Sequence, residues 1–180
     1  MLAQLKHSPL IRNTYRSIFN RRWAVEYSQM RAFYAQFFAK RDLVFDIGAN
    51  VGEYSDVFTE LGARVVAVEP NPSCCESLYQ LARIRDVRVE GCAVGEKVGH
   101  ATLRRCSETY FSTLNEKWLE QTKDSPVYRS VKWLDPIDVP VTTVDSLIRR
   151  HGKPTFIKID VEGFEANVIR GMSTPPVPEF

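Results

Sequence analysis

Short apolar runs alternate with amphipathic stretches along the chain, which is the pattern of an α/β protein. Leu43–Ile47 and Arg64–Glu69 are rich in β-branched residues and predict strands that are buried on both faces. Between them, apolar residues recur at helical spacing over Glu53–Leu61, and a glycine follows where the helix should end. A strand, a helix and a second strand in this order predict a βαβ unit with a right-handed crossover.

The rest of the chain after this unit divides into further elements and one irregular stretch. Residues 107–140 have no clear period, and their aromatic residues suit either a substrate lid or a surface loop that seals the core; both interpretations stay open. These aromatic residues include Trp118, Tyr128 and Trp133, and Ser112 and Thr113 lie in the same stretch. The other expected elements are a helix Pro72–Ile84, a strand Val87–Val94 that turns back as a hairpin into Ala101–Cys106, a strand Val139–Val144, a helix Thr143–Arg150, a strand from Phe156, and a helix Val161–Ile169.

An aromatic stripe precedes the first strand. Its residues recur at steps of four and three, which predicts an amphipathic helix. A basic helix with an aromatic face would suit a membrane surface or a partner, but we expect this one to pack on the sheet or to cover the cofactor. Residues 1–22 are basic and only weakly periodic, and we divide the chain into a helical segment 1–42 and a domain 43–180. The stripe consists of Trp23, Tyr27, Met30, Tyr34 and Phe37, widened by Phe33 and Phe38.

The turn after the first strand has the composition of a ligand-binding turn. Gly48 and Gly52 allow positive φ angles, and Asn50 tolerates the left-handed region better than most residues. The turn has neither the Lys-Ser/Thr pair of a P-loop nor the third glycine of the dinucleotide fingerprint. Asp46 lies just before the turn, and a carboxylate there would repel a pyrophosphate but suits an ammonium or sulfonium group.

A second acid, Glu69, ends the second strand, where a carboxylate usually binds ribose hydroxyls. Asp46 and Glu69 together predict a site for S-adenosylmethionine, with Asp46 near the methionine end and Glu69 on the ribose. The alternative is an ordinary α/β turn with two solvated acids.

Three sequence blocks resemble the FkbM-type methyltransferases, which depend on S-adenosylmethionine. They are Val44–Ser55 (VFDIGANVGEYS), Val65–Pro72 (VVAVEPNP) and Phe156–Glu165 (FIKIDVEGFE), and the resemblance runs from about Arg31 to Gly171. It implies a Rossmann-like class I methyltransferase fold, a mostly parallel sheet with helices on both faces, and methylation of a hydroxyl on a sugar, polyketide or similar small molecule. The expected cofactor-binding residues are Asp46, Gly48, Asn50, Gly52, Glu69, Pro70, Asn71, Cys92 and Ala93. The last two would touch the adenine, or else form only a tight strand exit.

The third block contains the expected catalytic residues. Lys158 interrupts an apolar strand and projects on the same side as Asp160, near the end of the strand where ligands bind in open α/β sheets. Asp160 is the expected base or ligand of the acceptor hydroxyl, Lys158 is expected to tune its charge, and Glu162 is the second candidate. The alternative is a structural ion pair of Lys158 with Asp160. A divalent cation on the two acids would need a third ligand, which the sequence does not identify, so no metal is expected.

Composition limits the classes of function. The chain has 180 residues, 44% hydrophobic and 26% charged, which is ordinary for one globular domain. A net charge of +2 gives no argument for nucleic acid. The four cysteines form no C-x-x-C pair, which predicts free thiols in the reducing cytoplasm. No apolar run reaches the length of a transmembrane segment, and no secretory signal is recognisable.

The last residues suggest an incomplete sheet. The class I fold normally has seven strands, whereas only four of its core strands can be recognised, so we expect a truncated member whose fourth strand is an edge that could pair in a homo-oligomer. A non-catalytic module of the same fold is therefore an alternative to a methyltransferase. An NAD-dependent oxidoreductase is a weaker alternative, because Asp46 and the missing third glycine argue against it.

Overall fold

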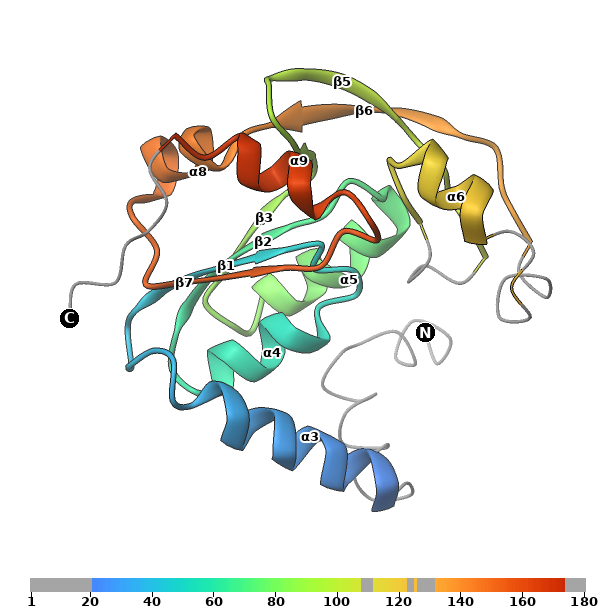
Figure 1. Ribbon diagram of the computed structural model, residues 1–180. Coiled ribbons are helices and arrows are strands. Elements are labelled where there is room, and N and C mark those ends of the chain that lie inside the picture. The colour runs from blue at the N-terminus through green and yellow to red at the C-terminus, as the bar shows by residue number, and fades with distance from the viewer. Residues whose placement is uncertain (1–20, 108–111, 123–124, 126–131, 174–180) are drawn as a thin grey trace.

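A computed structural model of the protein describes residues 21–107, 112–122, 125 and 132–173 (Figure 1). Its helices are α3 (Arg21–Tyr34), α4 (Glu53–Glu60), α5 (Pro72–Ala82), α6 (Glu116–Thr122), α8 (Val144–His151) and α9 (Glu165–Arg170). Its strands are β1 (Leu43–Ile47), β2 (Arg64–Val68), β3 (Val87–Glu90), β4 (Ala93–Val94), β5 (Gly99–Leu103), β6 (Ile137–Thr142) and β7 (Phe156–Ile159).

Four parallel strands in the order β3-β2-β1-β7 form the main sheet. Helices α4 and α5 cover one face, while α8 and α9 lie over the other (Figure 1). This arrangement confirms the expected α/β, Rossmann-like methyltransferase fold.

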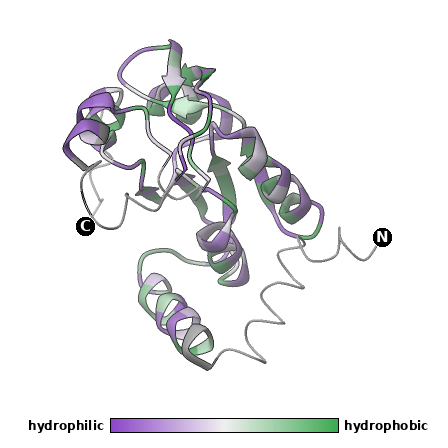
Figure 2. Ribbon diagram, turned by 90° about the vertical axis from the view of Figure 1, so that its right-hand side faces the viewer, coloured by the Kyte–Doolittle hydropathy of each residue, from purple (hydrophilic) through white to green (hydrophobic). Residues whose placement is uncertain are grey.

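The alternation of side chains along β1 explains why both faces need a cover. Phe45 and Ile47 are buried in the cluster that includes residues of α8 and α9, whereas Val44 is buried in the cluster that includes residues of α4 and α5. Figure 2 shows hydrophobic residues along the central strands. Because both faces of the strand are buried, its sequence is almost continuously apolar.

A second sheet of three strands, in the order β4-β6-β5, corrects the expected hairpin. Strand β6 lies between β4 and β5, parallel to the first and antiparallel to the second. The predicted strand Val87–Val94 is also divided, because β3 ends at Glu90 and the N–H of Cys92 turns back to the Glu90 carbonyl. A turn signal in the sequence is local, and it does not show that a strand from a distant part of the chain inserts between its two arms.

Helix α9 begins at Glu165 and not at Val161 as predicted. The reason is the backbone before it: Glu162 and Gly163 have φ angles of 51° and 87°, which a right-handed helix cannot include. The helix predicted at Thr143–Arg150 is confirmed as α8, and the Thr143 side chain caps it by accepting the Ser146 N–H.

Helix α3 packs against α4 and the neighbouring core. Of the aromatic stripe, Tyr27, Met30, Tyr34 and Phe38 contact this core, as expected. Phe33 and Phe37 are 54% and 41% exposed, so their predicted burial is wrong, although the Phe37 ring still stacks on Phe156. The Trp23 side chain and residues 1–20 lie outside what the structure describes. Among the described helices, none combines the length and hydropathy that crossing a membrane requires.

Candidate active site

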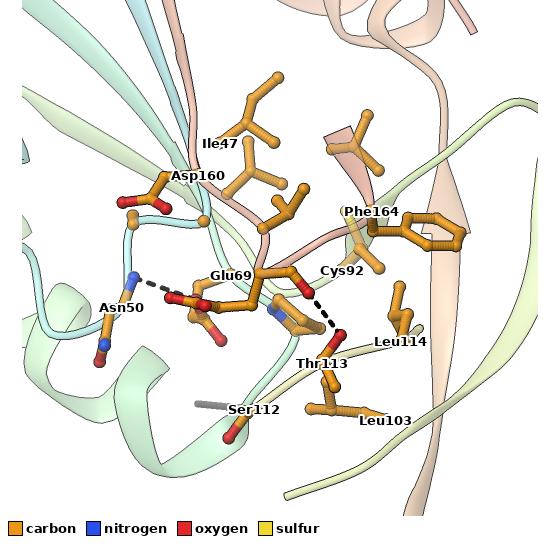
Figure 3. A pocket seen from close by; sticks show the side chains of 18 of the residues that line it. Ile47, Asn50, Glu69, Cys92, Leu103, Ser112, Thr113, Leu114, Asp160 and Phe164 are labelled. Carbon is orange, nitrogen blue, oxygen red and sulfur yellow. Dashed lines mark hydrogen bonds between the residues drawn. The ribbon is translucent and has the colours of Figure 1, made fainter. Parts of the chain in front are cut away.

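A pocket opens where β1, β2 and β7 end (Figure 3). The β1–α4 turn, the end of β2, the region of β4 and the β7–α9 loop contribute to it, together with Leu103 of β5 and with Ser112, Thr113 and Leu114 from the long irregular stretch. Of the predicted site residues, it brings together Gly48, Asn50, Glu69, Pro70, Cys92, Ala93, Lys158, Asp160 and Glu162. Asp46, Gly52 and Asn71 are not among the lining residues.

The turn between β1 and α4 has the backbone that its composition predicts. Gly48, Asn50 and Gly52 have φ angles of 78°, 48° and 87°. Gly48 has a further reason to lack a side chain, because a Cβ there would overlap the carbonyl oxygen of Asp160. The absence of a side chain at Gly48 therefore allows the backbone of Asp160, just after β7, to lie close to the turn.

The N–H groups of this turn bind the neighbouring strand. Gly48 and Ala49 both donate to the Val68 carbonyl, at 2.9 and 3.1 Å, and the Asn50 N–H donates to Glu69 Oε2 at 3.0 Å. A glycine turn that binds a pyrophosphate directs such groups at the ligand. The N–H groups of Gly48, Ala49 and Asn50 are already used within the protein, and in this respect the turn differs from a phosphate-binding turn.

Glu69 lies at the end of β2 and is only 8% exposed. Its Oε1 atom accepts the Asn71 N–H at 2.8 Å, in addition to the Asn50 N–H on Oε2 (Figure 3). Burial raises the pKa of Glu69 to about 7, although the two N–H groups favour the charged form. Each oxygen keeps acceptor capacity, so the carboxylate can also bind ligand hydroxyls.

Asn71 supports Glu69 and the following helix. Its backbone N–H binds the Glu69 carboxylate, and its side chain accepts the Ser73 N–H as the N-cap of α5. Pro70, between the two, lines the pocket.

Asp46 is fully buried beneath the pocket and faces Lys158. The two residues occupy paired positions on β1 and β7, and Asp46 Oδ1 lies 3.3 Å from Lys158 Nζ. Its other oxygen accepts the Ser55 hydroxyl from the first turn of α4, at 2.7 Å. Asp46 is predicted to lie near the methionine end of the ligand, and in the structure its carboxylate is bound to Lys158 and Ser55.

Lys158 forms the predicted ion pair with Asp160, at 3.5 Å, in addition to the shorter one with Asp46. Burial lowers the pKa of Lys158, but the two carboxylates outweigh this effect, so its pKa lies above the ordinary value. The ammonium also lies 4.5 Å from the centre of the Tyr54 ring. The lysine in the pocket is therefore charged and held from three sides.

Asp160 and Glu162 are more accessible than Asp46 and Glu69. The Asp160 side chain is 57% exposed, while Glu162 is half-buried. Burial raises the pKa of Glu162, and the nearby charges of Asp160 and Glu165 add to this effect. Within the described parts of the chain, no group of three or more histidine, cysteine or acidic residues is arranged to hold a metal ion.

The opposite part of the lining is apolar. Cys92 and Ala93 lie there, together with Val94, Leu103, Leu114 and Phe164. Burial raises the pKa of Cys92 to about 11, so its thiol stays neutral. A wall of small and apolar side chains suits a flat ring such as a nucleobase.

Several lining residues were not predicted from the sequence. Tyr54 and Phe164 both lie within blocks that resemble the family, so both could have been found. Leu114 lies in the irregular stretch, where no pattern marks it. Of the residues considered for a lid, Ser112 and Thr113 line the pocket, and Tyr128 lies outside the described residues.

Comparison with known proteins identifies one family. The family model described as the methyltransferase FkbM domain matches residues 46–175. Among solved structures, a proposed transferase from Pyrococcus horikoshii is 24% identical, with a TM-score of 0.32. The match covers 37% of this chain and 28% of that chain, and a likeness of this extent carries no argument about function. No curated protein matches the chain.

Proposed function

Because the chain belongs to the FkbM methyltransferase family, we propose that it transfers a methyl group from S-adenosylmethionine to a hydroxyl of a small molecule or saccharide. The observation that carries the proposal is one pocket that joins Glu69, at the end of β2, to Lys158 and Asp160, at the end of β7. The pocket thus contains a carboxylate that can bind a ribose, Glu69, and a charged pair that can bind an acceptor hydroxyl, Lys158 and Asp160.

The charges of the pocket favour a positively charged cofactor over a dinucleotide. Among the described residues of the lining are four with carboxyl groups, namely Glu53, Glu69, Asp160 and Glu162. Lys158 is the only lysine or arginine among these described residues, and Asp46 compensates its charge from below. A pyrophosphate would meet net repulsion here, and the N–H groups of Gly48, Ala49 and Asn50 are already bonded to Val68 and Glu69.

The cofactor-binding residues have distinct proposed tasks. Glu69 accepts the ribose hydroxyls, while Cys92 and Ala93 form the edge of the adenine site. Gly48, Asn50 and Gly52 give the turn its shape, and Asp46 fixes Lys158. Pro70 and Asn71 hold the end of β2 in place.

Asp160 is the proposed catalytic base. When bound, S-adenosylmethionine supplies a methyl group on a positively charged sulfur. Asp160 holds the acceptor hydroxyl in line with this methyl group and accepts its proton as the oxygen–carbon bond forms and the carbon–sulfur bond breaks, with the bonding electrons left on sulfur. Lys158 compensates the negative charge of Asp160, and Glu162 is the second candidate for the base.

Ligand-dependent thermal unfolding tests the cofactor. S-adenosylhomocysteine at a hundred times its Kd should add about 2.7 kcal/mol, or roughly 5–10 °C in Tm for a chain of this size. Glu69→Ala should abolish this shift. A shift with NAD and none with S-adenosylhomocysteine would overturn the proposal in favour of an oxidoreductase.

Methyl transfer to a panel of hydroxylated sugars and polyketides, followed with a labelled methyl group, tests catalysis. Asp160→Asn should lower turnover about a hundredfold or more without loss of S-adenosylhomocysteine binding. Asp86→Asn, an exposed aspartate outside the pocket, is the matched control and should leave turnover unchanged. Unchanged turnover in Asp160→Asn would reject the assigned base. Cofactor binding without transfer to any acceptor would favour a non-catalytic module.

The location, organisation and assembly of the chain are proposed on separate grounds. All four cysteines are buried free thiols, which supports a reducing compartment such as the cytoplasm. Strand β7 is an edge of the described main sheet, so pairing in a homo-oligomer remains a prediction. The division into segments 1–42 and 43–180 also remains a prediction.

A further inference from the structure

A short arm of the irregular stretch, residues 112–118, is bonded to the loop that carries the candidate catalytic acids. Thr113 Oγ1 donates to the Glu162 carbonyl at 2.7 Å (Figure 3). Asn115 Nδ2 donates to the next carbonyl, that of Gly163, at 2.6 Å. Two side chains of the arm thus bind two successive peptide groups of the β7–α9 loop.

The arm is also braced internally. Thr113 Oγ1 accepts the Asn115 N–H at 2.9 Å, and Asn115 Oδ1 accepts the Trp118 N–H at 3.1 Å. The Trp118 ring occupies the space next to Gly163, where a Cβ would come within 2.6 Å of it. The arm therefore contacts the loop through two hydrogen bonds and one packed ring.

The loop held in this way has an unfavourable backbone. Glu162 adopts a φ angle of 51°, in the left-handed region that is unfavourable for a residue with a Cβ. From the other side, Glu165 Oε1 accepts the N–H groups of Val161 and Gly163, at 3.0 and 3.2 Å. Contacts on both sides keep Glu162 in this conformation, and its side chain lines the pocket.

We propose that Thr113 and Asn115 are positioning residues that hold the Glu162 carboxyl group in the pocket, so that the arm sets the preference of the site for a positively charged cofactor. This inference rests on the proposed function. Without the two hydrogen bonds, Glu162 relaxes towards an ordinary backbone conformation and its carboxyl group leaves its place in the lining.

The affinities for S-adenosylmethionine and S-adenosylhomocysteine, measured by calorimetry, test the proposal without any acceptor. The two probes differ in the methyl group and in the positive charge on sulfur. Thr113→Val, which keeps the shape and removes the hydroxyl, should lower the affinity for S-adenosylmethionine about three- to tenfold relative to that for S-adenosylhomocysteine. Thr113→Ser should restore the wild-type ratio, and Thr102→Val, at an exposed threonine of β5, should not change it. Asn115→Ala is the second variant and should change the ratio in the same direction.

A double-mutant cycle separates positioning from general loss of structure. Glu162→Gln alone should lower the ratio of the affinity for S-adenosylmethionine to that for S-adenosylhomocysteine. Adding Thr113→Val should then lower this ratio no further, because the charge that Thr113 positions is gone. Circular dichroism should show that each variant is folded. Two results would overturn this inference but not the proposed function. One is an unchanged ratio of the two affinities in both Thr113→Val and Asn115→Ala. The other is an equal effect of Thr113→Val on this ratio with and without Glu162→Gln. Failure of the unsubstituted chain to bind either probe would instead overturn the proposed function and the inference with it.

Discussion

Glu69 combines burial with a carboxyl group that two backbone N–H groups hold in place. Its folded-state pKa of about 7 lies above the ordinary value of 4.5. At a pH between these two pKa values, Glu69 is protonated in the folded chain and ionised in the unfolded chain. The contribution of Glu69 to stability therefore falls as the pH rises through this range. A ligand that donates hydrogen bonds to the carboxylate favours the charged form and opposes this loss.

We therefore expect the affinity for S-adenosylhomocysteine to rise with pH. If only the ionised carboxylate binds, affinity should increase about tenfold from pH 6 to pH 8, because the ionised fraction increases by that factor around a pKa of about 7. Calorimetric titration across this range measures the effect. Glu69→Gln should bind more weakly and with a flat pH profile, and an equally flat profile in the unsubstituted chain would contradict the proposed role.

Gly48 is the second residue with a specific requirement. A Cβ at this position would overlap the Asp160 carbonyl, and the φ angle of 78° disfavours any other residue. Gly48→Ala should lower the free energy of unfolding by about 2–4 kcal/mol, from the strained backbone and the overlap together. Gly99→Ala is the matched control, because a Cβ at Gly99 would meet no atom within 4 Å. Urea denaturation of the two variants compares them, and equal stabilities would show that the contact with Asp160 can relax.

The pair of Asp46 and Lys158 shows at the residue scale what a linear pattern can predict. The lysine in an apolar strand indicated a buried partner, and Asp160 was the nearest acid on the same strand face; this contact is confirmed. Asp46 forms the shorter contact, because parallel pairing places it directly beside Lys158. Strands β1 and β7 are far apart in the sequence and become neighbours only through the sheet topology. The spacing of residues along the chain therefore did not reveal Asp46 as a partner of Lys158.

At the scale of elements, α3 shows how one side of a helix is chosen for burial. Tyr34 makes edge contacts with the rings of Tyr54, Phe58 and Phe156, and so links the helix to α4 and β7. The neighbouring Phe33 is 54% exposed and makes edge contacts only with Tyr34 and Phe37 among the rings described. The aromatic stripe in the sequence was wider than the face that the core covers.

Removal of these two rings should have unequal effects. Tyr34→Ala should lower the free energy of unfolding by about 2–3 kcal/mol, because it leaves a cavity among packed rings. Phe33→Ala should cost less than about 1 kcal/mol, because its ring is mostly in solvent already. Thermal unfolding of both variants measures the difference. A larger loss for Phe33→Ala would mean that the outer face of α3 is covered by a contact outside the described residues.

At the scale of the whole molecule, the pocket joins segments that are far apart in the sequence. The β1–α4 turn, Thr113 and Leu114 of the arm, and the β7–α9 loop contribute to one lining. Of the residues that the structure describes in α3, none is in this lining, although α3 packs on the same domain core. Ligand binding should therefore affect the three segments together and leave α3 unchanged.

Hydrogen exchange with and without S-adenosylhomocysteine tests this connection. Amides in residues 47–54, 112–115 and 158–164 should exchange more slowly with the ligand, because all three segments contact the space it fills. Amides of α3 should exchange at the same rate and are the internal control. Protection limited to residues 47–54 would show that the arm and the β7–α9 loop do not close on the ligand.

Local residue patterns predict several parts of this protein: the central strands, the glycine turn with its positive φ angles, the helix α8, and the blocks that identify the family. These features depend on side-chain spacing and on the conformations allowed to each residue, and both can be read over a few positions. Three further features became visible in the folded chain alone: the insertion of β6 between β4 and β5, the pairing of Asp46 with Lys158, and the binding of Thr113 and Asn115 to the β7–α9 loop. Each of these contacts joins segments that are distant in the chain, and no local pattern encodes which distant segment becomes the neighbour.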